Sequence, residues 1–254
     1  MTHTQETSLQ EVIVNLPSYE LGLYTNNKLA KKFRISIGMG YNGKDQTPIC
    51  KGVIHEKRKD IRFHNKKGII TTITRTFNEK GEELIYKIPY PQMRGLGVQL
   101  HQKGKTLEKY IIHSTTDEFQ LETPCSEGCL RLGINDMLNL YDLICPEKET
   151  GKLPTPIPLT VNYSTLEIKQ NHLLLHADIY GKISSWKDEL KKCLKQKGIN
   201  PTEIEFGKTL SEIIAMQKML SNNHKALLEK MSRPFPDNYV TQEQISSLHN
   251  TTFL

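Results

Sequence analysis

The chain has 254 residues, and its 34 lysine and arginine residues against 28 aspartate and glutamate residues give a formal net charge of +6. This length predicts one or two domains and suffices to bury a core without disulfide bonds. Hydrophobic residues make up 37% and charged residues 24%, which excludes a chain that is disordered throughout. No apolar run approaches the roughly 20 residues of a membrane-spanning helix. The clustered basic stripe and fold motif of a nucleic-acid-binding protein are also missing from the sequence.

The first half of the chain is predicted to form β-strands. Residues 11–16 form the first, which Pro17 ends. Residues 20–24 and 29–38 flank Asn26 and Asn27, and this favours a hairpin because asparagine tolerates the left-handed backbone of a tight turn. Further strands are expected at 69–77, 83–88, 97–100 and 109–113.

The pattern changes near residue 135. Apolar residues at helical spacing predict a helix over 135–144, with Asn135 as its N-cap. The proline-rich stretch 154–158 is expected to lead into a strand at 159–163, and a further strand is expected at 173–179.

The chain is predicted to become helical from residue 184. A first amphipathic helix begins near Trp186 and stops at Gly198. A longer helix follows over 210–231, and its apolar stripe is interrupted by Gln217 and His224. This helix is expected to pack on the main domain or, alternatively, to bind a protein partner. The last twenty residues are expected to form an extended tail.

The chain has five cysteines, so at least one is free or pairs with another chain. None of them forms a C-x-x-C pair, which argues against a structural zinc site. Cys145 and Cys193 lie on apolar helical faces and are expected in the core, and Cys50 is expected to be buried or idle.

The segment around Cys129 carries the clearest chemical signal. Cys129 follows a glycine, so a substrate could approach closely, and successive backbone N–H groups in such a turn can form an oxyanion hole. Arg131 could lower the pKa of the thiol. His113 ends a predicted strand and could act as the base, with Ser114 holding its tautomer. The alternative is a buried, unreactive Cys129 and a histidine with a purely structural role.

The residues from His113-Ser114 to Ser126-Glu127-Gly128-Cys129-Leu130-Arg131 resemble the signature of the L,D-transpeptidase catalytic domain (YkuD) family. That signature is a His followed by Gly or Ser, then some fifteen residues later Ser/Thr-His-Gly-Cys-x-Arg. Here Cys129 follows His113 by 16 residues. Thr47-Pro48 resembles the family's Thr-Pro loop, and the resemblance covers about residues 10 to 165.

The resemblance implies a mainly β fold, a YkuD-type sandwich of mixed sheets with a helix after the catalytic cysteine. It implies a catalytic domain over 10–183, and residues 184–254 would be a helical C-terminal extension and tail. The implied partner is the peptidoglycan stem peptide, with no metal or organic cofactor. Because peptidoglycan lies outside the cytoplasmic membrane, the resemblance implies the cell envelope, the periplasm in a Gram-negative organism, and a leader that has been removed.

The resemblance also implies residue roles. Cys129 would attack the third residue of a tetrapeptide stem and release D-alanine, with His113 as base and Ser114 beside it. Backbone N–H groups of Gly128 and Cys129 would hold the oxyanion, and Arg131, Ser126 and Glu127 would position the substrate. An amine would then resolve the thioester to a cross-link, or water would give L,D-carboxypeptidase action.

Glu127 departs from the family signature, which has histidine at this position. An inward-pointing carboxylate would raise the pKa of the Cys129 thiol and blunt the nucleophile. A degenerate member that binds the wall or a partner without turnover is therefore a third alternative. A catalytic Cys129 would be expected to alkylate quickly near neutral pH. Cys125 could serve as a resolving thiol, although an idle thiol is the simpler interpretation.

Overall fold

The strand β1, Gln10–Asn15, has a neighbouring strand on each side in the main sheet. It pairs in parallel with β13, Gly151–Asn162, and antiparallel with β2, Glu20–Thr25. The computed structural model describes residues 9–40, 45–59, 73–77, 83–87, 93–115, 118–169, 172–196, 198, 210–231 and 252–253. Residues 69–72 of one predicted strand and most of the predicted tail lie outside this set.

The chain forms two compact units. The first comprises Met1–Asn15 and Tyr19–Asn162, and the second comprises Leu16–Ser18 and Tyr163–Leu254. The units therefore divide after Asn162, whereas the extension was predicted to begin at Ser184.

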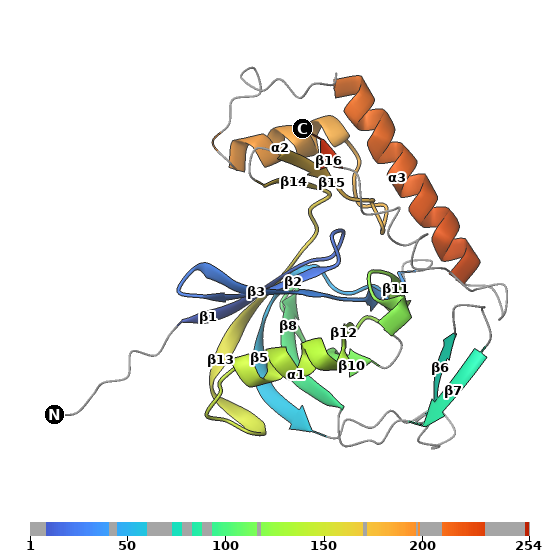
Figure 1. The fold of residues 1–254 in the computed structure, drawn as a ribbon. Helices are drawn as coiled ribbons and strands as arrows, with labels where there is room; N and C mark the ends of the chain where they lie inside the picture. The colour runs from blue at the N-terminus through green and yellow to red at the C-terminus, as the bar shows by residue number, and fades with distance from the viewer. Residues whose placement is uncertain are drawn as a thin grey trace. The chain divides into compact units, whose positions relative to one another are not determined.

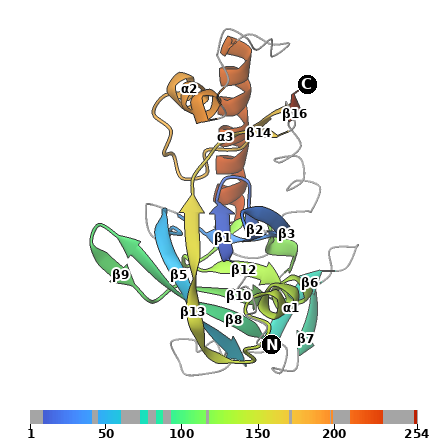
Figure 2. The same cartoon turned by 90° about the vertical axis from the view of Figure 1, so that its left-hand side faces the viewer.

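One mixed sheet of nine strands dominates the described part of the first unit (Figures 1 and 2). Its order is β12-β10-β8-β5-β13-β1-β2-β3, with β9 paired to β8. The further bounds are β3 Lys28–Arg34, β5 Cys50–Lys59, β8 Arg94–Gln102, β9 Lys105–Leu107, β10 Ile111–Thr115 and β12 Leu130–Gly133. Outside this sheet, β4 (Ile37–Gly38) pairs with β11 (Pro124–Ser126), and β6 (Ile73–Phe77) pairs with β7 (Glu83–Lys87). The predicted mainly β class with mixed sheets is confirmed.

Apolar side chains on alternate strand positions fill the core of the first unit. Val12 and Val14 of β1 are fully buried, as are Leu21 of β2 and Leu96 of β8. The predicted hairpin is confirmed, because Asn26 and Asn27 both have positive φ, 51° and 61°. The asparagines thus supply the turn that joins β2 to β3.

The proline-rich stretch 154–158 lies inside β13, so the prediction that the strand begins only after it, at residue 159, was wrong. The pairing of β13 with β5 shifts register between Lys152 and Ile157, and its pairing with β1 begins at Leu159. Pro154 and Pro156 fall in this irregular part, where a residue without a backbone N–H costs no ladder hydrogen bond. The strand therefore accommodates prolines that a regular ladder would reject.

The helix α1, Ile134–Leu143, follows β12 and contacts β8, β10 and β12 (Figure 1). Its N-cap is Gly133 and not the predicted Asn135. The carboxylate of Glu118, in the short 3-10 helix Glu118–Gln120, accepts the N–H of Ile134 at 3.0 Å. At the other end, the buried ammonium of Lys57 donates to the carbonyl of Ile144 at 3.0 Å. Side chains from other elements thus satisfy both helix ends.

The second unit contains two helices and a small antiparallel sheet. The sheet consists of β14 (Leu166–Lys169), β15 (His172–Leu175) and β16 (Thr252–Phe253). The helices α2, Trp186–Gln196, and α3, Leu210–Met231, match the predicted pair. No helix of the described chain is long and apolar enough to cross a membrane.

The residues that interrupt the apolar stripe of α3 lie on its buried face. Gln217 and His224 are 1% and 2% exposed, between the buried Ile213, Leu220 and Leu227. The Gln217 amide donates to the carbonyl of His176. The buried amide nitrogen of Gln217 is thus satisfied by a backbone carbonyl of the same unit, whereas its Oε1 is buried without a hydrogen-bond partner among the described residues.

Candidate active site

Cys129 lies in the short loop between β11 and β12, and Ser126 shapes that loop. The Ser126 side chain is buried, its Oγ accepts the N–H of Gly128 at 3.1 Å, and it donates to the carbonyl of Cys129 at 2.6 Å. The expectation that Ser126 positions substrate thus differs from its placement, because its hydroxyl is occupied by the backbone of the loop.

Gly128 holds a conformation that a side chain would not fit. Its φ is +109°, and a Cβ at this position would lie 2.6 Å from the ring of Tyr110. Its carbonyl accepts a hydrogen bond from Thr47 Oγ at 3.0 Å, and Thr47 Oγ in turn accepts the N–H of Gly38 at 2.9 Å. The Thr-Pro loop therefore packs directly on the residue before the cysteine.

The N–H of Gly128, predicted as an oxyanion donor, already donates to Ser126. The N–H of Cys129 has no hydrogen-bond partner among the described residues. Because the Gly128–Cys129 peptide is planar and trans, the bond from Thr47 to the Gly128 carbonyl also fixes the direction of the Cys129 N–H. Of the two predicted donors, the Cys129 N–H is therefore the one that remains available.

His113 sits on β10, directly beside Arg131 on the parallel strand β12. Its side chain is 2% exposed, and its Nδ1 lies 2.8 Å from the carbonyl oxygen of Ser114. A carbonyl can only accept, so Nδ1 carries the proton and Nε2 carries the lone pair in the neutral ring. Burial, helped by the positive charge of Arg131, lowers the pKa of His113 to about 4, although the hydrogen bond to the Ser114 carbonyl acts in the opposite direction. The imidazole is therefore neutral at neutral pH.

Ser114 contributes through its backbone and not through its hydroxyl. Ser114 Oγ accepts the N–H of Arg94 at 3.0 Å and lies 3.3 Å from both Met93 Sδ and the Arg94 carbonyl. The prediction that Ser114 holds the imidazole tautomer fits its position, but the Ser114 carbonyl is the group that does so. The hydroxyl instead ties β10 to the start of β8.

The Cys129 thiol is half-buried, and burial raises its pKa. A backbone hydrogen bond from Ile111, two residues before His113 on β10, lowers this pKa, and so does the charge of Arg131. The carboxylate of Glu127 raises it again. The net direction is upward, so the structure favours a neutral thiol beside a neutral imidazole. Because alkylation requires the thiolate, this direction of the pKa predicts slower alkylation near neutral pH than was expected for a catalytic Cys129.

The sequence comparison supplies the family. The model of the L,D-transpeptidase catalytic domain (YkuD) matches residues 10–156, more than half of the chain. The chain belongs to the L,D-transpeptidase catalytic domain family. This family acts on peptidoglycan, which lies outside the cytoplasm.

Three solved structures illustrate the structural likeness. An L,D-transpeptidase from Mycobacterium smegmatis is 13% identical, with a TM-score of 0.35 and coverage of 61% of this chain and 59% of that one. The catalytic domain of the E. faecium enzyme is 17% identical, with a TM-score of 0.33 and coverage of 63% and 100%. One from Xylanimonas cellulosilytica is 15% identical, with a TM-score of 0.37 and coverage of 64% of each chain. The alignment thus spans about three fifths of the first structure's length. No curated protein matches the sequence.

Arg131 and Glu127 flank the cysteine with opposite charges. Arg131 Nε is buried without a hydrogen-bond partner among the described residues, and its Nη1 lies 3.9 Å from Cys125 Sγ. Glu127 is exposed and replaces the histidine of the family signature. Both charges act on the Cys129 pKa, so Glu127 has an electrostatic effect at the nucleophile even though its side chain faces solvent.

The sequence analysis missed two residues of this site. Tyr110 packs its ring against Gly128, and Ile111 supplies a backbone hydrogen bond to the Cys129 thiol. Only their position within three residues of His113 in the chain hinted at this role. Within the described ranges all five cysteines are free thiols, and no cluster of three or more His, Cys, Asp or Glu side chains could hold a metal ion.

Proposed function

We propose that this chain is a cysteine L,D-transpeptidase that acts on tetrapeptide stems of peptidoglycan in the cell envelope. Membership of the family supports the reaction class. The observation that carries the proposal is the orientation of His113, whose Nδ1–H donates to the Ser114 carbonyl and so leaves Nε2 as the proton acceptor. A base with this tautomer on the strand next to the cysteine loop is what a thiol nucleophile requires.

In the first step, the Cys129 sulfur attacks the carbonyl of the third stem residue while His113 Nε2 takes the thiol proton. Because both groups are neutral beforehand, the proton moves as the carbon–sulfur bond forms. The Cys129 N–H stabilises the oxyanion, in the direction that Thr47 fixes through the Gly128 carbonyl. The tetrahedral intermediate then breaks its carbon–nitrogen bond, and the imidazolium returns the proton to the departing D-alanine amine.

Arg131 positions the substrate in this proposal. Its planar guanidinium suits a carboxylate, and its buried Nε–H lacks a partner among the described residues. A carboxylate bound there would satisfy that donor. The exposed Glu127, two residues before Cys129, would face a positively charged substrate group.

The thioester is resolved by an amine or by water. An amine from a second stem forms a cross-link between third residues, whereas water gives a tripeptide and net L,D-carboxypeptidase action. His113 serves both outcomes, because it accepts a proton from either nucleophile. The elevated pKa of the Cys129 thiol, to which Glu127 contributes, is the observation that favours the third candidate, a member that binds without turnover.

Mass spectrometry of the protein mixed with a disaccharide-tetrapeptide, beside a Cys129→Ala control, tests the proposal. Loss of D-alanine with cross-linked dimers would support transpeptidation, and loss with tripeptide alone would favour the carboxypeptidase. No Cys129-dependent change would contradict catalysis on this substrate. Intact-protein mass spectrometry would separately detect the thioester on Cys129.

A further inference from the structure

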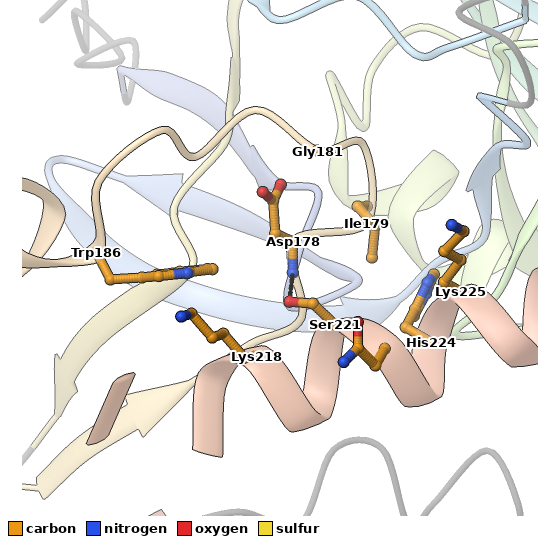
Figure 3. Close-up of a pocket in the computed structure, with 9 residues that line it drawn as sticks. Asp178, Ile179, Gly181, Trp186, Lys218, Ser221, His224 and Lys225 are labelled. Atoms are coloured by element: carbon orange, nitrogen blue, oxygen red, sulfur yellow. Dashed lines mark hydrogen bonds between the residues drawn. The ribbon is translucent and has the colours of Figure 1, made fainter. Parts of the chain in front are cut away.

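The second unit contains a pocket that the proposed catalysis does not use. Its volume is about 370 Å³, within the range of small-molecule sites. The helix α3 forms one wall with Lys218, Ser221 and Lys225, and the chain from Ile179 to Trp186 forms the other (Figure 3).

The two walls are tied together without a ligand. Ser221 Oγ accepts the backbone N–H of Asp178 at 3.0 Å and donates to the Gln217 carbonyl one turn earlier at 2.9 Å. This links the chain of the opposite wall to α3 in the middle of the pocket (Figure 3). The pocket is therefore preformed, and little of the binding free energy of a ligand would be lost in ordering its walls.

The charge of the pocket is positive. Lys218 and Lys225 both line it, and neither has an ion pair within the described chain. The one acidic side chain nearby, Asp178, turns its carboxylate away from the Ser221 contact (Figure 3). That carboxylate accepts hydrogen bonds from the Tyr163 hydroxyl and the N–H groups of Lys182 and Ile183. The Asp178 carboxylate is therefore held by hydrogen bonds from its own chain segment, and the ammonium groups of Lys218 and Lys225 are available to a ligand.

Trp186 adds a flat apolar surface to this cationic pocket. The side chain is half-buried at the start of α2, and its ring extends toward the pocket (Figure 3). An indole face suits a ring with an apolar side, while Lys218 and Lys225 suit an anion. The Ser221 hydroxyl lies between them, but its hydrogen bonds to Asp178 and Gln217 hold the two walls together.

We propose that this pocket binds a saccharide that carries a carboxylate. The apolar C–H face of the sugar ring would stack on Trp186, and the carboxylate would lie between Lys218 and Lys225. N-acetylmuramic acid with a free lactyl group has this chemistry. The proposal deepens the proposed function and rests on it for the choice of sugar, because N-acetylmuramic acid is the peptidoglycan sugar that carries the stem peptide, while the residues that would bind it are remote in sequence from Cys129.

Trp186 provides the test, because it is the single tryptophan of the chain and its fluorescence therefore reports on the pocket alone. The full chain is titrated with N-acetylmuramic acid and, in parallel, with N-acetylglucosamine, which lacks the lactyl carboxylate. We expect a saturable change with N-acetylmuramic acid that weakens as salt is added, and affinity lower by about fivefold or more for N-acetylglucosamine.

Charge variants then locate the anion. Lys218→Gln and Lys225→Gln should each weaken the binding of N-acetylmuramic acid and leave that of N-acetylglucosamine unchanged. Lys191→Gln, an exposed lysine of α2 outside the pocket, is the matched control. Trp186→Phe, followed by calorimetry, should weaken both sugars, and thermal unfolding of each variant checks that the unit is folded.

Two results would overturn the proposal. In one, the two sugars bind equally weakly and the lysine variants change nothing. In the other, inorganic phosphate displaces N-acetylmuramic acid while Trp186→Phe has no effect, which would mean a simple anion site. The Lys218 and Lys225 variants should still release D-alanine from a free tetrapeptide, and Cys129→Ala should still bind the sugar, so failure here and failure of the catalytic proposal are distinguishable.

Discussion

The hydroxyl of Thr47 donates a hydrogen bond to the backbone carbonyl of Gly128, 81 residues later in the chain, with an oxygen–oxygen distance of 3.0 Å. The same hydroxyl oxygen accepts the N–H of Gly38. Through the rigid peptide plane, this contact orients the N–H of Cys129, the proposed oxyanion donor. A side chain from a distant loop thus sets the geometry at the nucleophile.

Thr47→Val should therefore lower kcat while Thr47→Ser preserves it. Valine keeps the shape of threonine but removes the hydroxyl, which is the group that fixes the Gly128 carbonyl. Loss of one well-placed oxyanion donor costs about 10²-fold to 10³-fold in kcat, and a misdirected donor should cost about tenfold or more. The measurement is the rate of thioester formation on Cys129 by mass spectrometry. Equal rates for both variants would contradict this role of Thr47.

Gly128→Ala should inactivate the protein because it combines backbone strain with a clash. Its φ of +109° disfavours any side chain, and the new Cβ would lie 2.6 Å from the Tyr110 ring. Gly104→Ala is the matched control, since Gly104 also has a positive φ of +74° but nothing lies within 4 Å. We expect loss of acylation for Gly128→Ala alone. Partial recovery in Gly128→Ala combined with Tyr110→Ala would identify the ring as the cause.

The activity should persist to unusually low pH. His113 has a pKa of about 4, so the neutral base survives well below the pH at which an ordinary histidine is protonated. The rate of acylation should be measured between about pH 3.5 and pH 8, a range that covers both the lowered pKa of His113 and the ordinary histidine pKa. We expect this rate to fall on the acid side near pH 4. An acid limb near the ordinary histidine pKa would contradict a buried, neutral His113.

The same residue should link stability to pH. Below its unfolded-state pKa of 6.5, His113 is protonated in the unfolded chain, whereas in the folded chain it stays neutral down to about pH 4. The free energy of unfolding therefore decreases as the pH falls through this window. The loss in the free energy of unfolding over this pH range is about 3 kcal/mol. Urea unfolding at several pH values should show this loss in the natural chain, and a smaller one in His113→Gln. Parallel stability curves for the two proteins would speak against the shift.

The Cys129 thiol should alkylate slowly at pH 7, with a rate that rises steeply only in alkaline solution. Burial raises its pKa, and the Glu127 carboxylate raises it further. Glu127→Gln removes that charge and should move the alkylation profile of Cys129 to lower pH. Iodoacetamide labelling, read at Cys129 by peptide mass spectrometry, separates this thiol from the other four. An unchanged profile would mean that Glu127 has no influence on the nucleophile.

Local sequence patterns predicted much of this fold. They failed where the local structure depends on contacts with segments that are distant in the sequence. The Asn26-Asn27 turn and the helix after the cysteine follow from residues close in sequence. The prolines at 154 and 156 were placed outside a strand, because their tolerance depends on a register shift against β5. The roles of Tyr110 and of the Ser126 hydroxyl likewise arise from backbone packing at Gly128 that no short motif encodes.

Lys57 should prove important for stability, although it lies outside the proposed chemistry. Lys57 is 3% exposed, and its ammonium donates to the carbonyl of Ile144 just beyond α1 and lies 4.3 Å from the centre of the Tyr141 ring. Lys57→Met would leave that buried carbonyl without its donor and remove the positive charge from the negative end of the helix dipole. We expect a loss of about 2–3 kcal/mol in the free energy of unfolding.

Lys59→Met is the control for this prediction. Lys59 is on the same strand, but its partner Glu149 is an exposed side chain, so its loss should cost less than about 1 kcal/mol. Denaturant unfolding compares the two variants under identical conditions. Because α1 directly follows the strand that pairs with His113, Lys57→Met should also lower the acylation rate, whereas Lys59→Met should leave it unchanged. Equal stability of the two variants would show that Lys57 contributes no more than a surface charge.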